Sequence, residues 1–299
     1  MIKIKNLSRI IGQDPSNNCF YGIPKMMEKL SANSEVSISS RIFYTFASSL
    51  KNRMMALVHE FENCGNWLFK RRSWLPVFFI AGGILMMYLG NRQAILFDMR
   101  DELIFLGVSM FGELVRIITV GFTPKNTSGR NTINGQVADE LNVTGIYSLI
   151  RHPLYFGNFF MWLGPVLFLR SIEAVIVFIL LYWLYYERIM FAEEQYLRRK
   201  FGEAYDKWSE SVHSIIPYSF KYIPSKLFFS IKSVLKREYN SFVNIFVIFI
   251  LLDLFRNYFL SERIYLNSMW IYLSVAAGVI WLALRTIEKR THWLDVEGR

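Results

Sequence analysis

Two clusters of charged residues carry the side chains that could do chemistry. The first contains Arg151 and His152, and the second, further along the chain, contains the adjacent carboxylates Glu193 and Glu194. Arginine and imidazole groups bind a carboxylate, and a carboxylate binds an ammonium group, through charge-assisted hydrogen bonds. If the fold brings the two clusters together, they could hold a zwitterionic ligand.

Aromatic and glycine residues beside the first cluster add to this chemistry. Tyr147 and Tyr155 offer ring faces for stacking a purine or for holding a sulfonium cation. Gly157 permits a close backbone approach, and Pro153 suits a first helical turn because it lacks an N–H donor there. S-adenosylmethionine has all four parts, namely a carboxylate, an ammonium group, a purine and a sulfonium. The residue types alone also permit other ligands.

Long apolar blocks must position these clusters. Of the 299 residues, 53% are hydrophobic, and they fall in blocks with few charges. Such blocks are typical of membrane spans rather than of one globular core. We therefore predict an all-α fold, a multi-pass transmembrane bundle of about six spans. The predicted spans are 74–89, 103–122, 154–170, 171–186, 242–259 and 269–284.

Basic residues border alternate ends of the predicted spans. They gather at 70–72, 125–130, 188–236 and 285–290. The positive-inside rule then places both termini and the cofactor pocket on the cytoplasmic side. The net charge of +10 also suits anionic lipid headgroups. We expect neither a nucleic-acid partner nor a metal, because no signature or ligand spacing for either is present.

One charge pair falls inside a predicted span. Glu113 and Arg116 lie three residues apart and so share a helix face. Charges inside a span face the protein interior or a wet cavity. The pair therefore predicts either a structural ion pair or the wall of a site.

The two clusters together resemble the isoprenylcysteine carboxyl methyltransferase and phospholipid methyltransferase family. The pattern Gly-x-Tyr-x-x-x-Arg-His-Pro-x-Tyr-x-Gly begins at Gly145, and Glu-Glu-x-x-Leu-x-x-x-Phe-Gly-x-x-Tyr begins at Glu193. An apolar hairpin separates them, and the resemblance covers residues 145–217. It implies a helical membrane bundle that binds S-adenosylmethionine. The implied cofactor-binding residues are Tyr147, Arg151, His152, Pro153, Tyr155, Gly157, Glu193, Glu194 and Tyr205.

The resemblance implies methyl transfer to a membrane lipid or a lipidated acceptor, through a carboxylate, phosphate or amine headgroup. A carboxylate or phosphate is ionised at neutral pH and needs no general base. An amine would need deprotonation, for which we predict Glu194 as the catalytic residue. Arg188, near the membrane interface, is the candidate for holding an anionic acceptor group.

Two alternatives stay open. Membrane NADPH-dependent sterol or lipid reductases share a similar Arg-His-Pro-x-Tyr-x-Gly turn, although the Glu-Glu pattern favours the methyltransferase. The other alternative is a non-catalytic membrane scaffold of the same fold. The chain also has a long N-terminal segment and two apolar blocks after Tyr239. We divide it into an interfacial segment with an amphipathic helix (1–72), a methyltransferase core (73–240) and two extra C-terminal spans (241–299). The sequence leaves the acceptor and the oligomeric state open.

Overall fold

The computed structural model describes residues 56–72, 75–89, 98–124, 127, 136–217 and 221–298, and residues 60–299 form one compact unit. These described residues form helices and two isolated β-bridges, without a strand. After a helical stretch over 56–70, the helices are α4 (Leu75–Leu89), α5 (Met99–Gly121), the 3-10 turn η3 (Ile146–Ser148), α6 (Pro153–Phe168), α7 (Ile172–Phe201), α8 (Glu203–Ser211), α9 (Ile231–Ser261) and α10 (Ser268–Arg290).

Six helices fall where the six spans are predicted, so the all-α fold class is confirmed. Of the described helices, α5, α7, α9 and α10 have the length and apolar composition that crossing a membrane requires. The count of six spans is not confirmed, because α4 and α6 have only 15 and 16 residues. About 20 residues are needed to cross the hydrocarbon core as a helix.

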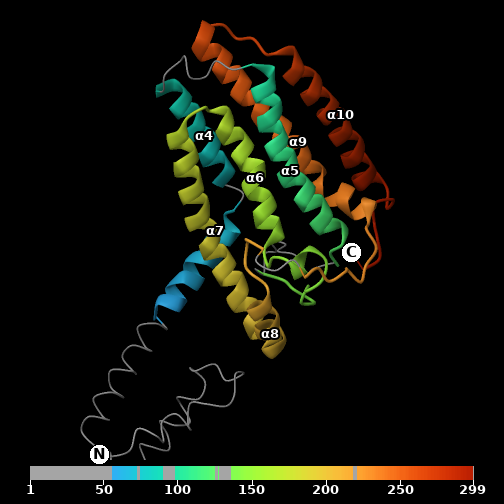
Figure 1. The fold of residues 1–299 in the computed structure, drawn as a ribbon. Helices are drawn as coiled ribbons and strands as arrows, with labels where there is room; N and C mark the ends of the chain where they lie inside the picture. The colour runs from blue at the N-terminus through green and yellow to red at the C-terminus, as the bar shows by residue number, and fades with distance from the viewer. Residues whose placement is uncertain are drawn as a thin grey trace, which may run out of the picture. The chain divides into compact units, whose positions relative to one another are not determined.

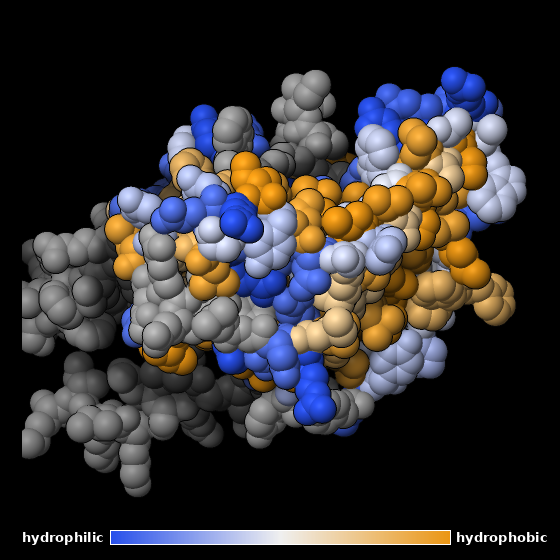
Figure 2. Space-filling view, turned by 90° about the horizontal axis from the view of Figure 1, so that it is seen from above, coloured by the Kyte–Doolittle hydropathy of each residue, from blue (hydrophilic) through white to orange (hydrophobic). Residues whose placement is uncertain are grey.

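Exposed apolar side chains cover the outer faces of the long helices. They include Ile176 and Leu180 on α7, and Tyr272 and Val279 on α10. Seen from above in Figure 2, apolar side chains form broad orange areas beside blue hydrophilic ones. A soluble monomer rarely exposes so much contiguous apolar surface, which suits contact with lipid.

Small residues bring α5 and α6 close together. A Cβ atom added at Gly157 of α6 would lie 2.8 Å from the carbonyl oxygen of Gly112 on α5. One α5 turn earlier, the Ser109 hydroxyl donates a hydrogen bond of 3.0 Å to the carbonyl of Met161. In lipid, the hydrophobic effect does not drive helices together. Close packing of small residues and interhelical hydrogen bonds drive their association instead.

The C-terminal helices are joined to α5 by buried charges. Arg256 of α9 donates from Nη1 to Glu102 of α5 at 2.7 Å, and Trp270 of α10 donates to the second Glu102 oxygen at 2.7 Å. Arg256 also pairs with Asp253. The predicted division at residue 240 falls inside α9, which runs from Ile231 to Ser261 as one helix.

The functional motifs meet at one end of the bundle. In Figure 1, the end of α5, the start of α6, the end of α7 with α8, and the start of α9 all lie toward the lower end. The opposite turn between α6 and α7 lies where the sequence predicts it. There Ser171 caps α7 by accepting a hydrogen bond of 3.1 Å from the backbone N–H of Ala174.

Candidate functional site

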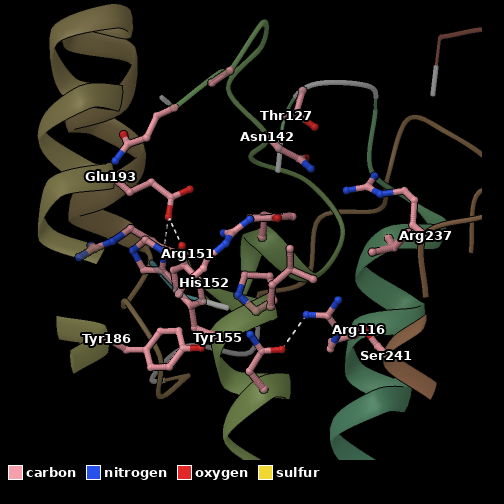
Figure 3. Close-up of a pocket in the computed structure, with 18 of the residues that line it drawn as sticks. Arg116, Thr127, Asn142, Arg151, His152, Tyr155, Tyr186, Glu193, Arg237 and Ser241 are labelled. Carbon is pink, nitrogen blue, oxygen red and sulfur yellow. Dashed lines mark hydrogen bonds and ion pairs between the residues drawn. The ribbon is translucent and has the colours of Figure 1, made fainter. Parts of the chain in front are cut away.

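A cavity of about 690 Å³ opens at this end of the bundle. That volume lies within the range of small-molecule sites. Figure 3 shows Arg151, His152 and Tyr155 with Glu193 on one side of the cavity, opposite Arg116 and Arg237. The residues of both sequence patterns that line the cavity are Tyr147, Arg151, His152, Pro153, Tyr155, Glu193, Glu194, Leu197 and Tyr205.

Backbone hydrogen bonds place the first cluster. Gly145, at φ +63°, starts the turn that leads into η3, a conformation in which glycine is unstrained. Beyond it, the backbone N–H groups of Arg151 and His152 donate to the carbonyls of His213 and Ser214 at 2.8 and 2.9 Å. Pro153 then opens α6, as predicted. The stretch that follows α8 thus holds the first cluster at the cavity.

A glycine turn places Tyr205 beside the second cluster. Gly202, at φ +54°, ends α7 and lets α8 fold away from the α7 axis. Tyr205 of α8 is fully buried against the cavity. Burial, and next the Glu194 carboxylate, raise the pKa of the Tyr205 hydroxyl well above its usual range. Tyr205 therefore stays neutral at physiological pH.

Glu194 joins the two clusters through one oxygen atom. Its Oε1 accepts from Nε of Arg151 at 2.9 Å and lies 3.0 Å from Nε2 of His152. Nη1 of Arg151 also donates to the backbone carbonyls of Ser209 and Val212, at 2.7 and 2.8 Å. These contacts within the protein occupy much of the hydrogen-bonding capacity of Arg151 and Glu194. Both residues therefore hold the site together.

Glu193 has a different environment from its neighbour. Its Oε2 accepts a hydrogen bond of 2.9 Å from the Tyr155 hydroxyl and lies 3.7 Å from Nδ1 of His152. Its Oε1 has no hydrogen-bond partner among the described residues. In Figure 3 the Glu193 carboxylate points into the cavity. Of the two carboxylates, Glu193 is thus the better placed to bind a ligand cation.

Aromatic rings form the floor beside Glu193. The His152 and Tyr155 rings stack with centroids 5.6 Å apart, and Tyr155 lies 5.0 Å from Tyr186. The Tyr147 ring also lines the cavity, and burial raises the pKa of its hydroxyl well above the usual range. The site can therefore offer neutral aromatic faces to a purine or to a cation.

Two predicted site residues lie outside the cavity lining. Gly157 faces α5, where a Cβ atom would lie 2.7 Å from Cγ of Arg116, so its small size serves helix packing. The Arg188 guanidinium lies 3.6 Å from the Phe61 ring centroid and pairs with Glu187 at 3.0 Å. Neither residue is among the described residues that line the cavity.

Arg116, one of the two charged residues noted within α5, forms its ion pair with a residue other than Glu113. Arg116 lines the cavity, but it donates from Nε and Nη2 to Glu238 of α9 at 2.9 and 2.7 Å, and from Nη1 to Asn158 at 2.6 Å. Glu113 is fully buried, without a hydrogen-bond partner among the described residues. Of the two alternatives that the sequence left open, the described residues show no ion pair between Glu113 and Arg116, whereas Arg116 lines the cavity as the wall of a site would, because the helix crossing turns it toward α9.

Several residues that line the cavity were not predicted from the sequence. They come from the loop over 136–142 and from α9, and include Gln136, Asn142, Arg237, Ser241 and Asn244. For the residues of α9, the sequence offered one indication of a place in a site, because polar residues occur within the first turns of an otherwise apolar helix. Intramembrane polar residues usually face a partner or a cavity.

Comparison with known proteins matches residues 104–204 to the family model described as phospholipid methyltransferase. A probable protein-S-isoprenylcysteine O-methyltransferase of Oryza sativa subsp. indica is 28% identical over 132 residues, 42% of this chain and 69% of that protein. A protein-S-isoprenylcysteine O-methyltransferase of Schizosaccharomyces pombe is 40% identical over 81 residues, 26% of this chain and 34% of its own. The nickel-cobalt-cadmium resistance protein NccN of Alcaligenes xylosoxydans xylosoxydans is 33% identical over 85 residues, 28% of this chain and 39% of its own. No solved structure matches.

Proposed function

We propose that this chain belongs to the isoprenylcysteine carboxyl methyltransferase and phospholipid methyltransferase family, and that it transfers a methyl group from S-adenosylmethionine to a lipid or lipidated acceptor within a membrane. One observation carries the proposal. Residues of both family patterns, separated in sequence by most of α6 and α7, line a single cavity. The long apolar helices make the chain an integral membrane protein.

The cavity lining fits the parts of S-adenosylmethionine. Glu193, with one oxygen directed into the cavity, would bind the ammonium group. Tyr155 and Tyr147 would contact the purine or the sulfonium through their neutral ring faces. When bound, the cofactor supplies a methyl group already activated on a positively charged sulfur.

The protein's own contribution is chiefly positioning. Arg151, His152 and Glu194 lock the start of α6 to the end of α7, which fixes the binding groups before the ligand arrives. Holding two reactants in line can lower the activation barrier by at most about 7–11 kcal/mol. Because Glu194 already accepts from Arg151 and lies close to His152, we assign it this positioning role in place of the predicted base.

We also propose that the cavity opens to the cytoplasm. The basic stretch from Arg188 to Lys236 includes the end of α7, α8 and the start of α9, which surround the cavity. The positive-inside rule favours the cytoplasmic side for such a stretch. A cytosolic cofactor would then reach the site without crossing the membrane.

The first test is calorimetric titration of the detergent-purified protein with S-adenosylmethionine. Glu193→Gln removes the charge that faces the cavity, and we expect about a 10- to 100-fold weaker Kd, as for loss of a charge-assisted bond. Glu203→Gln is the matched control, because that side chain is 78% exposed and pairs with Lys207. Transfer of a labelled methyl group to membrane lipids or lipidated protein then tests the reaction itself. Saturable binding of NADPH in place of S-adenosylmethionine, or equal binding by both variants, would contradict the proposal.

A further inference from the structure

The helix that precedes α4 brings an arginine to the cavity, although it lies outside the segment that matches the family model. That match covers residues 104–204, whereas this helix ends at Lys70 and Arg72 follows it in a turn. Arg72 is among the residues that line the cavity. From the sequence we predicted an interfacial segment over 1–72, and no site residue within it. The structure therefore adds a cation from outside the family patterns.

Tight packing against α7 fixes the position of this helix. A Cβ atom added at Gly65 would lie 2.0 Å from the carbonyl oxygen of Arg188, so the two backbones are in direct contact there. Three residues further along, the carbonyl of Leu68 accepts a hydrogen bond of 3.1 Å from the Tyr185 hydroxyl. The contacts advance from 65 to 68 on this helix and run back from 188 to 185 on α7, so the two helices are antiparallel. The end of the helix that leads into Arg72 thus lies beside Tyr185.

Three tyrosines connect Arg72 with Glu193. The ring centroids of Tyr185 and Tyr186 are 5.4 Å apart, and those of Tyr186 and Tyr155 are 5.0 Å apart. The Tyr155 hydroxyl donates to Glu193 at 2.9 Å. All three hydroxyls lie within electrostatic reach of the Arg72 charge. Arg72 and Glu193 therefore lie on the same, tyrosine-lined side of the cavity.

Aromatic contacts give two adjacent arginines different positions. The guanidinium of Arg72 lies 4.6 Å from the ring centroid of Phe69, which is 1% exposed. Such a contact retains the charge and restricts the side chain before a ligand binds. The guanidinium of Arg71 instead lies 4.2 Å from the ring centroid of Trp67, which is exposed. Arg71 is not among the described residues that line the cavity.

Other charged residues also line the cavity, but their positions suit a ligand carboxylate less well. The ion pairs that include a lining cation are Arg116 with Glu238, Arg151 and His152 with Glu194, and Lys236 with Asp295. Arg237 lies across the cavity from Glu193 in Figure 3. The lining also includes Glu288, which accepts a hydrogen bond of 2.7 Å from Tyr239, and Glu140, which is exposed and therefore screened by water. The arginine beside the three tyrosines is thus the best placed to meet a carboxylate near Glu193.

The amino-acid part of the cofactor needs two partners of opposite charge close together. Its ammonium and carboxylate groups are attached to one carbon atom. A residue that binds the carboxylate must therefore lie near Glu193, the proposed partner of the ammonium group. The planar guanidinium group of an arginine matches a carboxylate through two parallel hydrogen bonds.

We propose that Arg72 binds the carboxylate of S-adenosylmethionine while Glu193 binds its ammonium group. The proposal rests on the proposed cofactor site and adds to it a residue from outside the family patterns. Arg72 takes the role that residue types alone suggested for Arg151, which is held by Glu194 and by two backbone carbonyls. The helix before α4 thereby becomes part of the site, because its packing at Gly65 sets where Arg72 lies.

The test is calorimetric titration of the detergent-purified protein with S-adenosylmethionine and with decarboxylated S-adenosylmethionine. The two ligands share the adenosine, the sulfonium and the amine, and differ by one carboxylate. We expect the wild-type protein to bind S-adenosylmethionine at least about 10-fold more tightly. Arg72→Gln should weaken binding of S-adenosylmethionine by about 10- to 100-fold, and should not weaken binding of the decarboxylated ligand.

Arg71→Gln is the matched control, because it removes the same charge from the adjacent residue outside the cavity lining. It should leave the affinity for both ligands unchanged. Arg72→Lys keeps the charge without the planar fork, so it should lose less affinity for S-adenosylmethionine than Arg72→Gln does. Glu193→Gln should weaken both ligands, because both carry the amine.

The outcomes separate this proposal from the one on which it rests. Binding of S-adenosylmethionine that Arg72→Gln leaves intact, or that it weakens equally for both ligands, would overturn the assignment of Arg72 and leave the cofactor site standing. Absent binding of S-adenosylmethionine by the wild-type protein would instead count against the cofactor site and the Arg72 assignment together.

Discussion

Replacing Arg256 by methionine should destabilise the helix bundle strongly. Arg256 is 5% exposed and serves two carboxylates that are also buried, Glu102 on α5 and Asp253 on α9. Met has a similar volume but no charge, so both carboxylates lose their cation. Trp270 would still donate to Glu102, and the Asn257 side chain and the backbone N–H of Asn267 to Asp253, but none of these donors is charged.

Breaking a buried ion pair by removing one partner costs about 3–5 kcal/mol, because a charge is left uncompensated. We expect Arg256→Met to lower the free energy of unfolding by about this amount. Arg256→Lys keeps the charge but has no planar fork to reach both carboxylates, so an intermediate loss is expected.

The assay is equilibrium unfolding in mixed micelles with increasing dodecyl sulfate, followed by tryptophan fluorescence and circular dichroism. Arg263→Met is the control, since Arg263 is exposed just after α9. A triple variant with Glu102→Gln and Asp253→Asn should recover much of the stability lost with Arg256→Met, because no charge is then stranded. A loss below about 1 kcal/mol for Arg256→Met would refute the reasoning. A triple variant no more stable than the single one would also refute it, because the loss would then come from packing.

Three further outcomes follow from contacts already described. Gly157→Ala should lower the unfolding free energy by about 1–3 kcal/mol, because the added methyl group has no room against α5. Gly278→Ala on α10 is the control in the same unfolding assay. It should be neutral or slightly stabilising, because nothing lies within 4 Å of the added Cβ. Arg188→Gln should leave the KM for an acceptor within about twofold in a methyl-transfer assay, because Arg188 lies against Phe61 outside the cavity lining, and a larger rise would place the acceptor at Arg188. The raised pKa of Tyr205 contributes stability that is complete below the ordinary value of 10.0 and is lost as pH rises above it. Tyr205→Phe should therefore flatten the fall of the melting temperature between about pH 9.5 and 11, and an unchanged slope would contradict this.

The sequence by itself determined the helices and the members of the family patterns. Apolar length and local capping are properties of one segment, so the turn before Ser171 and the start of α6 at Pro153 were correctly predicted. The order of the two patterns around an apolar hairpin also predicted the resemblance to the family whose model matches residues 104–204. Periodicity further indicated that Arg116 faces the protein interior.

Only the tertiary structure decided what each inward face meets. Arg116 pairs with Glu238, Gly157 packs on α5, and Arg188 lies against Phe61, although the sequence suggested another partner or role for each. The polar residues early in α9 were visible in the sequence, but only the packing of α9 showed that they line the cavity. The physical reason is that helical periodicity defines which residues share a face of one helix. The crossing and rotation of packed helices, set by contacts between distant segments, decide which faces meet.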